Sequence, residues 1–199
     1  MTGGTMQGPH PPEGARPGGI RGRGLVLIGG RGTGKSTVGR LVAGLAGRPF
    51  VDSDREIEGR SGRSIRAIFE ESGEPAFRDW EQKILARLAA EMPGAVLATG
   101  GGAVLREANR EVLRGFGLVV WLTADPAEMG RRLQTDRSGL AGRPALTPAG
   151  TLDELLAVLA ARGPLYAGLA DVTIATDGLA PTEVAEALLA HWPGECPPC

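Results

Sequence analysis

One segment of the sequence carries a pattern that binds nucleotide phosphates. The segment from Gly29 to Ser36, GGRGTGKS, matches G-x-x-x-x-G-K-[ST]. In such a loop the glycines let successive backbone N–H groups point at phosphate oxygens. We expect Lys35 to contact the β- and γ-phosphates and Ser36 to bind Mg²⁺. The predicted ATP-binding residues of this segment are Gly32, Thr33, Gly34, Lys35, Ser36 and Thr37.

Two carboxylates, Asp52 and Asp54, form a second candidate site. Phosphoryl transfer needs one group that orients or deprotonates the attacking hydroxyl and another that helps to hold magnesium. Asp52 and Asp54 could divide these roles. They could equally cap the helix that follows, because aspartate is a favoured N-cap residue. The spacing alone does not decide between the two interpretations.

The elements that must position these residues alternate between strand and helix. The expected strands are 25–28, 49–51 (ending at Asp52), 95–98, 118–122 and 172–175. The expected helices are 37–46, 54–60, 64–72, 75–91, 104–115, one that begins at Pro126, 152–161, 164–170 and 181–191. This alternation predicts an α/β domain with a five-stranded parallel sheet flanked by helices. Ligands of such sheets bind at the carboxyl ends of the strands, so the loop and the two carboxylates should face one cleft.

The composition argues against several other classes of protein. The 199 residues fit one domain, and a net charge of -1 with 4% aromatic residues does not favour binding to nucleic acid. No stretch approaches the roughly 20 apolar residues of a membrane helix. The N-terminus has no apolar signal region. We therefore expect a cytoplasmic monomer with small-molecule partners.

The ends of the chain and one internal segment should lie outside the packed core. Residues 1–22 are rich in Gly and Pro, which predicts a disordered leader before a domain at 23–192. Residues 134–150 mix Gly, Pro, Arg and Asp and are expected to form a mobile lid. In the tail, 193–199, Cys196 and Cys199 could form half of a metal or redox site, but no second pair completes it. We expect a flexible tail.

Several motifs together resemble the shikimate kinase family over about residues 25–190. The matching stretches are Gly29 to Thr37, Val51 to Glu58, Gly62 to Ile65, Ile68-Phe69, Gly73-Glu74, Phe77-Arg78 with Glu81, Thr99 to Val104, Arg143-Pro144, and Arg162 with Pro164-Leu165-Tyr166. They occur in the family's order and close to its spacing. The resemblance implies a P-loop fold of the nucleoside-monophosphate-kinase type with strand order 2-3-1-4-5. It also implies ATP-dependent phosphorylation of the 3-hydroxyl of shikimate.

The resemblance further implies roles for individual residues. Ser36 would bind Mg²⁺ directly, and Asp52 would support it through water. Asp54 would bind substrate hydroxyls and act as the base, while Arg78 and Arg162 would bind the substrate carboxylate. The implied substrate-binding residues are Asp54, Arg78, Gly100, Gly101, Gly102 and Arg162.

Two further arginines are implied at the nucleotide. Arg143 would come from the lid to neutralise charge on the transferring phosphate, and it completes a catalytic set with Asp54 and Lys35. Arg132 would lie against the adenine. Arg137 and Arg131 remain alternatives to these two arginines. The segment 176–178, TDG, carries no arginine, which leaves the contacts to the base open on that side.

Two other functions are considered. Another small-molecule kinase of the same fold, for instance one acting on gluconate, would share the phosphate loop. It need not carry Asp54, Arg78, the triple glycine and Arg162 together. A catalytically silent nucleotide-binding regulatory module should show a broken base or lid arginine, or a fused recognition domain. The tryptophans Trp80, Trp121 and Trp192 are expected to pack in the core.

Overall fold

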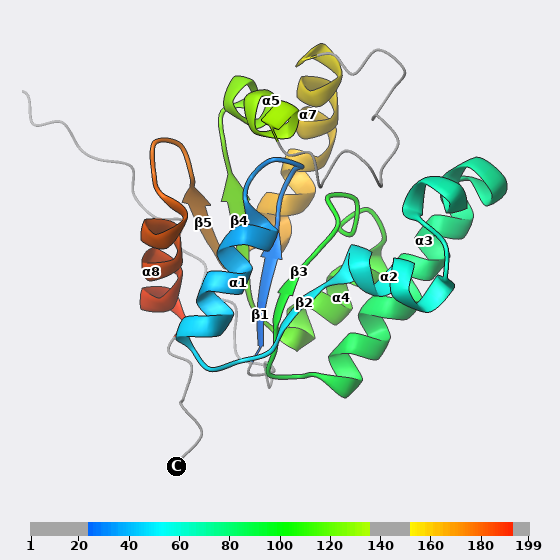
Figure 1. Ribbon diagram of the computed structural model, residues 1–199, viewed down its shortest axis with the longest axis horizontal. Coiled ribbons are helices and arrows are strands. Elements are labelled where there is room, and N and C mark those ends of the chain that lie inside the picture. The colour runs from blue at the N-terminus through cyan, green and yellow to red at the C-terminus, as the bar shows by residue number, and fades with distance from the viewer. Residues whose placement is uncertain (1–23, 136–151, 193–199) are drawn as a thin grey trace, which may run out of the picture.

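The computed structural model describes residues 24–135 and 152–192 (Figure 1). The leader, the Cys196/Cys199 tail and nearly all of the expected lid lie outside the described residues. Arg137 and Arg143 lie outside them too. Residues 134 and 135, which we expected to open the lid, instead belong to the last turn of a helix.

The elements alternate between strand and helix in the order expected. The strands are β1 Gly24–Ile28, β2 Phe50–Asp52, β3 Val96–Ala98, β4 Gly117–Thr123 and β5 Val172–Ala175. The helices are α1 Lys35–Leu45, α2 Ser53–Ser61, α3 Ile65–Glu91, α4 Glu107–Phe116, α5 Pro126–Thr135, α7 Leu152–Leu169 and α8 Pro181–His191.

The five strands form one parallel sheet in the order β2-β3-β1-β4-β5. In register, Val26 of β1 lies beside Leu97 of β3 and Val119 of β4. The predicted fold class and strand order are therefore confirmed. Because every pair is parallel, all carboxyl ends meet at one edge of the sheet, the upper edge in Figure 1.

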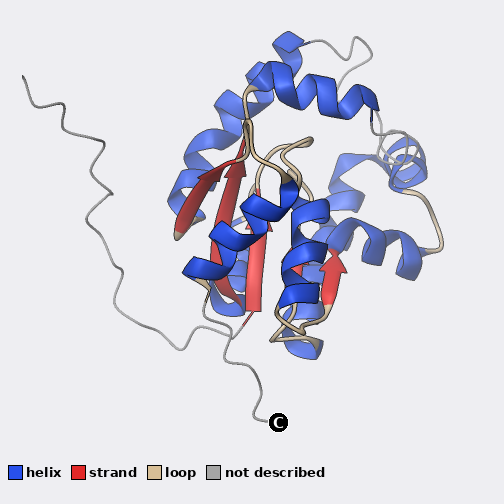
Figure 2. Ribbon diagram, turned by 60° about the vertical axis from the view of Figure 1, so that its left-hand side comes forward, coloured by secondary structure: helices blue, strands red, loops and turns tan. Residues whose placement is uncertain are grey.

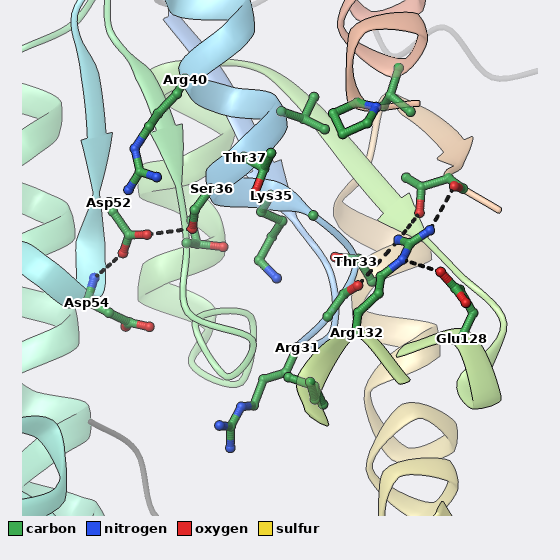
Figure 3. Close-up of a pocket in the computed structure, with 18 of the residues that line it drawn as sticks. Arg31, Thr33, Lys35, Ser36, Thr37, Arg40, Asp52, Asp54, Glu128 and Arg132 are labelled. Carbon is green, nitrogen blue, oxygen red and sulfur yellow. Dashed lines mark hydrogen bonds and ion pairs between the residues drawn. The ribbon is translucent and has the colours of Figure 1, made fainter. Parts of the chain in front are cut away.

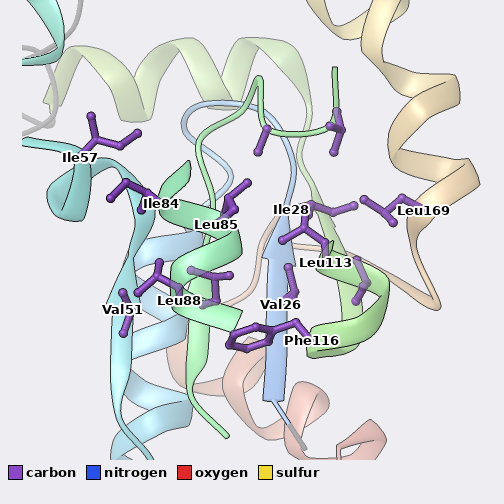
Figure 4. Close-up of a cluster of buried hydrophobic side chains, with 14 of the residues drawn as sticks. Val26, Ile28, Val51, Ile57, Ile84, Leu85, Leu88, Leu113, Phe116 and Leu169 are labelled. Atoms are coloured by element: carbon purple, nitrogen blue, oxygen red, sulfur yellow. The ribbon is translucent and has the colours of Figure 1, made fainter. Parts of the chain in front are cut away.

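Helices cover both faces of the sheet, and β1 shows why (Figure 2). Successive side chains of a strand point to opposite faces. Leu25 and Leu27 join a cluster with α1 and α8, whereas Val26 and Ile28 join one with α2, α3, α4 and α7 (Figure 4). All side chains of β1 are buried, which explains the unbroken apolar run GLVLI. Because β1 is packed on both faces, it fixes the position of the following loop at the carboxyl edge of the sheet.

The three tryptophans pack as expected. Trp192 is buried against the α1 and α8 side of the sheet. Trp80 and Trp121 are partly buried against the opposite cluster. Their burial accounts for them without a base-binding role.

Helix α4 begins later than the sequence suggested. We expected it at residue 104, but it begins at Glu107. The turn after β3 extends through Arg106 because side chains of α4 hold its carbonyl groups. Asn109 Nδ2 donates to the Ala103 carbonyl at 3.0 Å, and Arg110 donates to the carbonyls of Val104 and Leu105.

Helix α7 is continuous where two helices were expected. We predicted helices at 152–161 and 164–170, with Arg162 near a helix end, but α7 runs unbroken from Leu152 to Leu169 with Pro164 inside it. Tyr166 and Leu169, beyond the proline, are buried in the apolar cluster. Proline has no backbone N–H, so one hydrogen bond of the helix is missing. The burial of these two side chains stabilises the helix in spite of that loss. Arg162 is therefore an interior helix residue.

Two glycines of α1 provide a test of this packing. A Cβ at Gly39 would lie 2.6 Å from Phe50 Cε2 and 3.2 Å from Leu27 Cδ1, whereas a Cβ at Gly44 would meet nothing within 4 Å. We expect Gly44→Ala to gain about 0.5–1 kcal/mol of stability. In Gly39→Ala the same gain is opposed by overpacking of about 1–3 kcal/mol. Thermal unfolding should therefore rank Gly44→Ala above Gly39→Ala. Equal melting temperatures would contradict the close approach of α1 to the sheet.

Candidate active site

The phosphate loop joins β1 to α1 at the carboxyl edge of the sheet (Figure 3). Gly34, the residue before α1, has a left-handed φ of 88°. Gly32 also has a positive φ, 80°, and a Cβ there would lie 2.8 Å from the Met129 carbonyl oxygen. Both positions therefore require glycine, one for its conformation and the other also for space. The strand–loop–helix context predicted for the motif is present.

The side chain of Lys35 contacts the backbone of this loop. Its Nζ donates to the carbonyl of Gly29 at 2.9 Å and to that of Gly30 at 2.6 Å. The side chain is almost fully buried, and it stands in the first turn of α1, where the positive end of the helix dipole adds to its charge. This combination of a fixed ammonium group and a helix N-terminus suits a polyanion.

The two carboxylates, Asp52 and Asp54, differ in their contacts and in their position relative to α2. Asp52 Oδ1 accepts from the backbone N–H of Asp54 at 3.0 Å, so Asp52 caps α2. Its other oxygen, Oδ2, accepts from Ser36 Oγ at 2.6 Å (Figure 3). Asp54 is not a cap but lies in the first turn of α2, with 5% of its surface exposed. The capping interpretation thus holds for Asp52, which also faces the phosphate loop.

Ser36 and Asp52 fit the needs of Mg²⁺. A hydroxyl and a carboxylate oxygen are hard oxygen donors, and Mg²⁺ commonly takes only one or two protein ligands beside water and phosphate oxygens. Within residues 24–135 and 152–192, no group of three or more His, Cys, Asp or Glu could hold a metal ion. The donor set therefore fits a cation shared with a nucleotide rather than a cation bound by protein alone.

Asp54 is brought against the triple glycine that follows β3. A Cβ on Gly100 would lie only 2.7 Å from Asp54 Oδ1, so glycine is needed for this approach. Ser53, fully buried between the two carboxylates, fixes the neighbouring backbone: its Oγ accepts from Gly100 N at 3.1 Å. The ends of β2 and β3 are thereby joined.

Arg78 lies on the other side of the same glycines. A Cβ on Gly102 would lie 2.3 Å from Arg78 Nη1. The guanidinium forms ion pairs with Glu74 and with Glu81, each at 2.9 Å, and Glu81 is fully buried. Burial raises the pKa of Glu81, and the charge of Arg78 only partly opposes it. For Arg78 burial acts to lower the pKa, but Glu81 and Glu74 raise it overall. Arg78 is thus held as a cation.

Arg162 completes this group from α7. A Cβ on Gly101 would lie 3.8 Å from Arg162 Nη1, and the charge of Arg162 also acts on the pKa of Glu81. The structure therefore gathers every residue of the predicted substrate set around the triple glycine. Their individual roles stay predictions.

Arg132 lies at the nucleotide end of the site. It donates to the hydroxyl of Thr176 at 2.9 Å and to the Thr176 carbonyl at 3.0 Å, and it also pairs with Glu128 (Figure 3). Arg131 is 65% exposed and pairs with Glu128 alone among the partners that the described residues show. Hydrogen bonds from Arg131 and then Arg132 lower the pKa of Glu128 to about 2. Both arginines line a cavity at this end of the site, so the choice of Arg132 over Arg131 as the nucleotide contact stays a prediction.

A cavity of about 640 Å³ lies at the phosphate-loop end of the site. It is lined by the phosphate loop, by Asp52 and Asp54, and by Arg132 and Thr176. Pro181 and Val184 of α8 add apolar surface at one end. Asp54 both lines this cavity and contacts the triple glycine. It is therefore the point where a nucleotide and a second ligand would meet.

Two buried residues of the site had no predicted role. Glu81 was part of a matching stretch, and its spacing of three residues from Arg78 places both on one helix face, so the ion pair could have been foreseen. Ser53 gave no such signal. Its hydrogen bond to Gly100 joins segments 47 residues apart, and only the strand order makes them neighbours.

The fold and the site together define a P-loop phosphotransferase: a parallel sheet in the order 2-3-1-4-5, a phosphate loop after its central strand, and two carboxylates that line the same cavity as that loop. The model of the family described as shikimate kinase matches residues 31–192. The chain is 48% identical over 179 residues to the shikimate kinase of Pseudomonas syringae pv. tomato, covering 88% of this chain and 99% of that protein. The chain belongs to the shikimate kinase family.

Solved structures agree with this assignment. The shikimate kinase from Acinetobacter baumannii, solved in complex with shikimate, is similar with a TM-score of 0.78 and 39% identity, covering 84% of this chain and 91% of that one. A gluconokinase from Sinorhizobium meliloti is also similar, with a TM-score of 0.55 and 21% identity, covering 88% of this chain and 95% of that one. The second likeness shows the fold alone.

Proposed function

We propose that this protein transfers the γ-phosphoryl group of ATP to the 3-hydroxyl of shikimate, giving shikimate 3-phosphate and ADP. The observation that carries the proposal is the position of Asp54, which lines the nucleotide cavity and contacts the triple glycine. Arg78 and Arg162 lie at the same glycines and provide positive charge for a carboxylate. Family membership supports the same reaction.

At the nucleotide end, Lys35 and the loop N–H groups bind the ATP phosphates. Ser36 and Asp52 hold Mg²⁺, whose chemistry is to neutralise charge on the phosphate oxygens. Arg132, anchored by Thr176, borders the adenine, and apolar surface from Pro181 lines the same end. The lid arginine Arg143 would add positive charge at the transferring group when the lid closes.

At the acceptor end, the two arginines bind the carboxylate of shikimate, because a guanidinium presents paired donors to two carboxylate oxygens. Glu81 keeps Arg78 charged and fixed. With the carboxylate held there, a ring hydroxyl reaches Asp54. Asp54 accepts its proton as the hydroxyl oxygen attacks the γ-phosphorus, and the bond to the ADP oxygen breaks.

A substrate panel tests this assignment. ADP release is measured with ATP, Mg²⁺ and either shikimate or gluconate, since both acceptors carry a carboxylate and several hydroxyls. We expect turnover with shikimate and little with gluconate. Turnover with gluconate alone would overturn the roles of Arg78 and Arg162. ATP binding without turnover on either acceptor would favour the regulatory module instead.

We further infer a cytoplasmic monomer without nucleic-acid or membrane partners. ATP is a cytoplasmic co-substrate, and the proposed site draws its residues from one chain. Among the described helices, none combines the length and apolar character needed to cross a membrane.

The pairing of Ser36 with Asp52 allows the metal role to be tested apart from the fold. Asp52→Asn should raise the Mg²⁺ concentration for half-maximal activity by about 10- to 100-fold. Asparagine caps helices as well as aspartate, so α2 and the melting temperature should be preserved. Asp125→Asn is the matched control, because Asp125 Oδ1 accepts from Ala127 N at 2.8 Å at the start of α5, outside the metal site. An unchanged Mg²⁺ dependence in Asp52→Asn would remove Asp52 from the metal site.

A further inference from the structure

The hydroxyl of Tyr166 joins helix α7 to the triple glycine. Tyr166 lies on α7 and is 1% exposed. Its hydroxyl donates to the carbonyl of Gly101 at 2.5 Å. Gly101 is the central residue of the triple glycine, 65 residues earlier in the chain. One hydrogen bond therefore ties α7 to the turn that follows β3.

The same hydroxyl lies on the side of α7 that carries Arg162. Arg162 precedes Tyr166 by one helical turn, so the two side chains share a face of α7. Burial raises the pKa of the Tyr166 hydroxyl, and the nearby charge of Arg162 opposes this. A Cβ on Gly101 would lie 3.6 Å from the Tyr166 hydroxyl and 3.8 Å from Arg162 Nη1. Both side chains thus border the same side of Gly101.

The ring of Tyr166 is held independently of its hydroxyl. It stacks on Trp121 with centroids 5.6 Å apart and an interplanar angle of 26°. It also belongs to the apolar cluster on this face of the sheet. Removal of the oxygen alone would leave the ring in place, so the hydroxyl can be tested separately from the packing.

We propose that Tyr166 is a positioning residue for the acid substrate: its hydroxyl holds the Arg162 guanidinium against the Gly101 backbone before the substrate binds. The hydroxyl uses its proton on the carbonyl and a lone pair on the guanidinium. A free arginine side chain loses much rotamer freedom on binding a carboxylate, and fixing it beforehand reduces that cost. The inference rests on the proposed function, and it assigns Tyr166 to shikimate binding rather than to ATP binding or to the transfer step.

Tyr166→Phe tests the proposal. We expect the KM and the calorimetric Kd for shikimate to rise by about 5- to 20-fold, the effect of one hydrogen bond to a charged group. The KM for ATP and kcat should stay within about twofold, since the phosphate loop is untouched. Thr123→Val is the matched control. It removes a hydroxyl that faces the Ile174 carbonyl at 3.5 Å on the sheet, and it should leave shikimate binding unchanged.

A double-mutant cycle with Arg162→Gln supplies the second readout. If the hydroxyl acts through Arg162, the Tyr166→Phe change should add little to the Kd of the Arg162→Gln variant. Full additivity would overturn the proposal. So would an unchanged Kd for shikimate in Tyr166→Phe, a parallel rise in the KM for ATP, or loss of the native fold. Turnover of shikimate by the wild-type protein tests the proposed function separately. If the wild-type protein is active, a negative result in the variants counts against the role of Tyr166 alone.

Discussion

Asp54→Asn should lower kcat with shikimate by about 10²- to 10⁴-fold, the usual contribution of a general base. Asparagine has nearly the same size and fits the close approach to Gly100, but it cannot take up a proton at the reacting hydroxyl. The phosphate loop lies on separate residues, so ATP affinity should stay near that of the wild type. Single-turnover phosphoryl transfer and equilibrium ATP binding check the two halves of this expectation.

The control for Asp54 is a carboxylate remote from the cavity. Asp153 is exposed on α7 and does not line the site, so Asp153→Asn should keep wild-type turnover. Wild-type kcat in Asp54→Asn would remove Asp54 from the transfer step. A matched loss of ATP binding would instead show that the change had disturbed the nucleotide end.

Lys35→Met should lower kcat by about 10²- to 10³-fold, because a preorganised charge at the transferring phosphate is lost. Methionine keeps much of the apolar length of the side chain, which is almost fully buried. The ammonium group that lies within 3 Å of two loop carbonyls disappears. Steady-state kinetics with saturating shikimate, with ATP varied, measures the loss.

The chain offers a matched control for this change. Lys83, the other lysine of the sequence, is exposed on α3 and does not line the cavity. Lys83→Met should therefore leave kcat and the KM for ATP unchanged. If both variants kept wild-type kcat, the phosphate loop would not be the site of catalysis.

The sequence predicts the centre of the sheet well because β1 and β3 are buried on both faces. An unbroken apolar run such as Leu25 to Ile28 is the expected signal of such a strand, and β5 has the predicted bounds. Local signals also define the phosphate loop, in which Gly29, Gly32 and Gly34 have positive φ angles.

The observed bounds of two helices, α7 and α4, differ from those predicted from the sequence. Pro164 suggests a helix boundary, but the burial of Tyr166 and Leu169 keeps α7 continuous. At α4, the hydrogen bond from Asn109 to the Ala103 carbonyl prolongs the preceding turn. The effect at α7 depends on contacts made only after the elements pack, whereas the bonds at α4 join side chains to carbonyls five or six residues earlier.

The site residues divide in the same way, into those that sequence motifs identify and those that only the packed fold brings together. The resemblance identified residues that the fold gathers at the triple glycine, including Arg78 and Arg162. Two buried hydroxyls bond the same glycines from distant parts of the chain: Ser53 accepts from Gly100 N across 47 residues, and Tyr166 donates to the Gly101 carbonyl across 65. Such partners emerge only from the strand order. The position of Arg143 lies outside the described residues, so its role stays a prediction.

The position of the new phosphate on the product is the most direct test of the proposed transfer to the 3-hydroxyl of shikimate. The protein is incubated with ATP, Mg²⁺ and shikimate, and the product is examined by ¹H–³¹P correlation spectroscopy. With the carboxylate at Arg78 and Arg162 and the reacting hydroxyl at Asp54, we expect one ADP for each shikimate 3-phosphate. A phosphate on the 4- or 5-hydroxyl, or ADP formed without any phosphorylated shikimate, would contradict it.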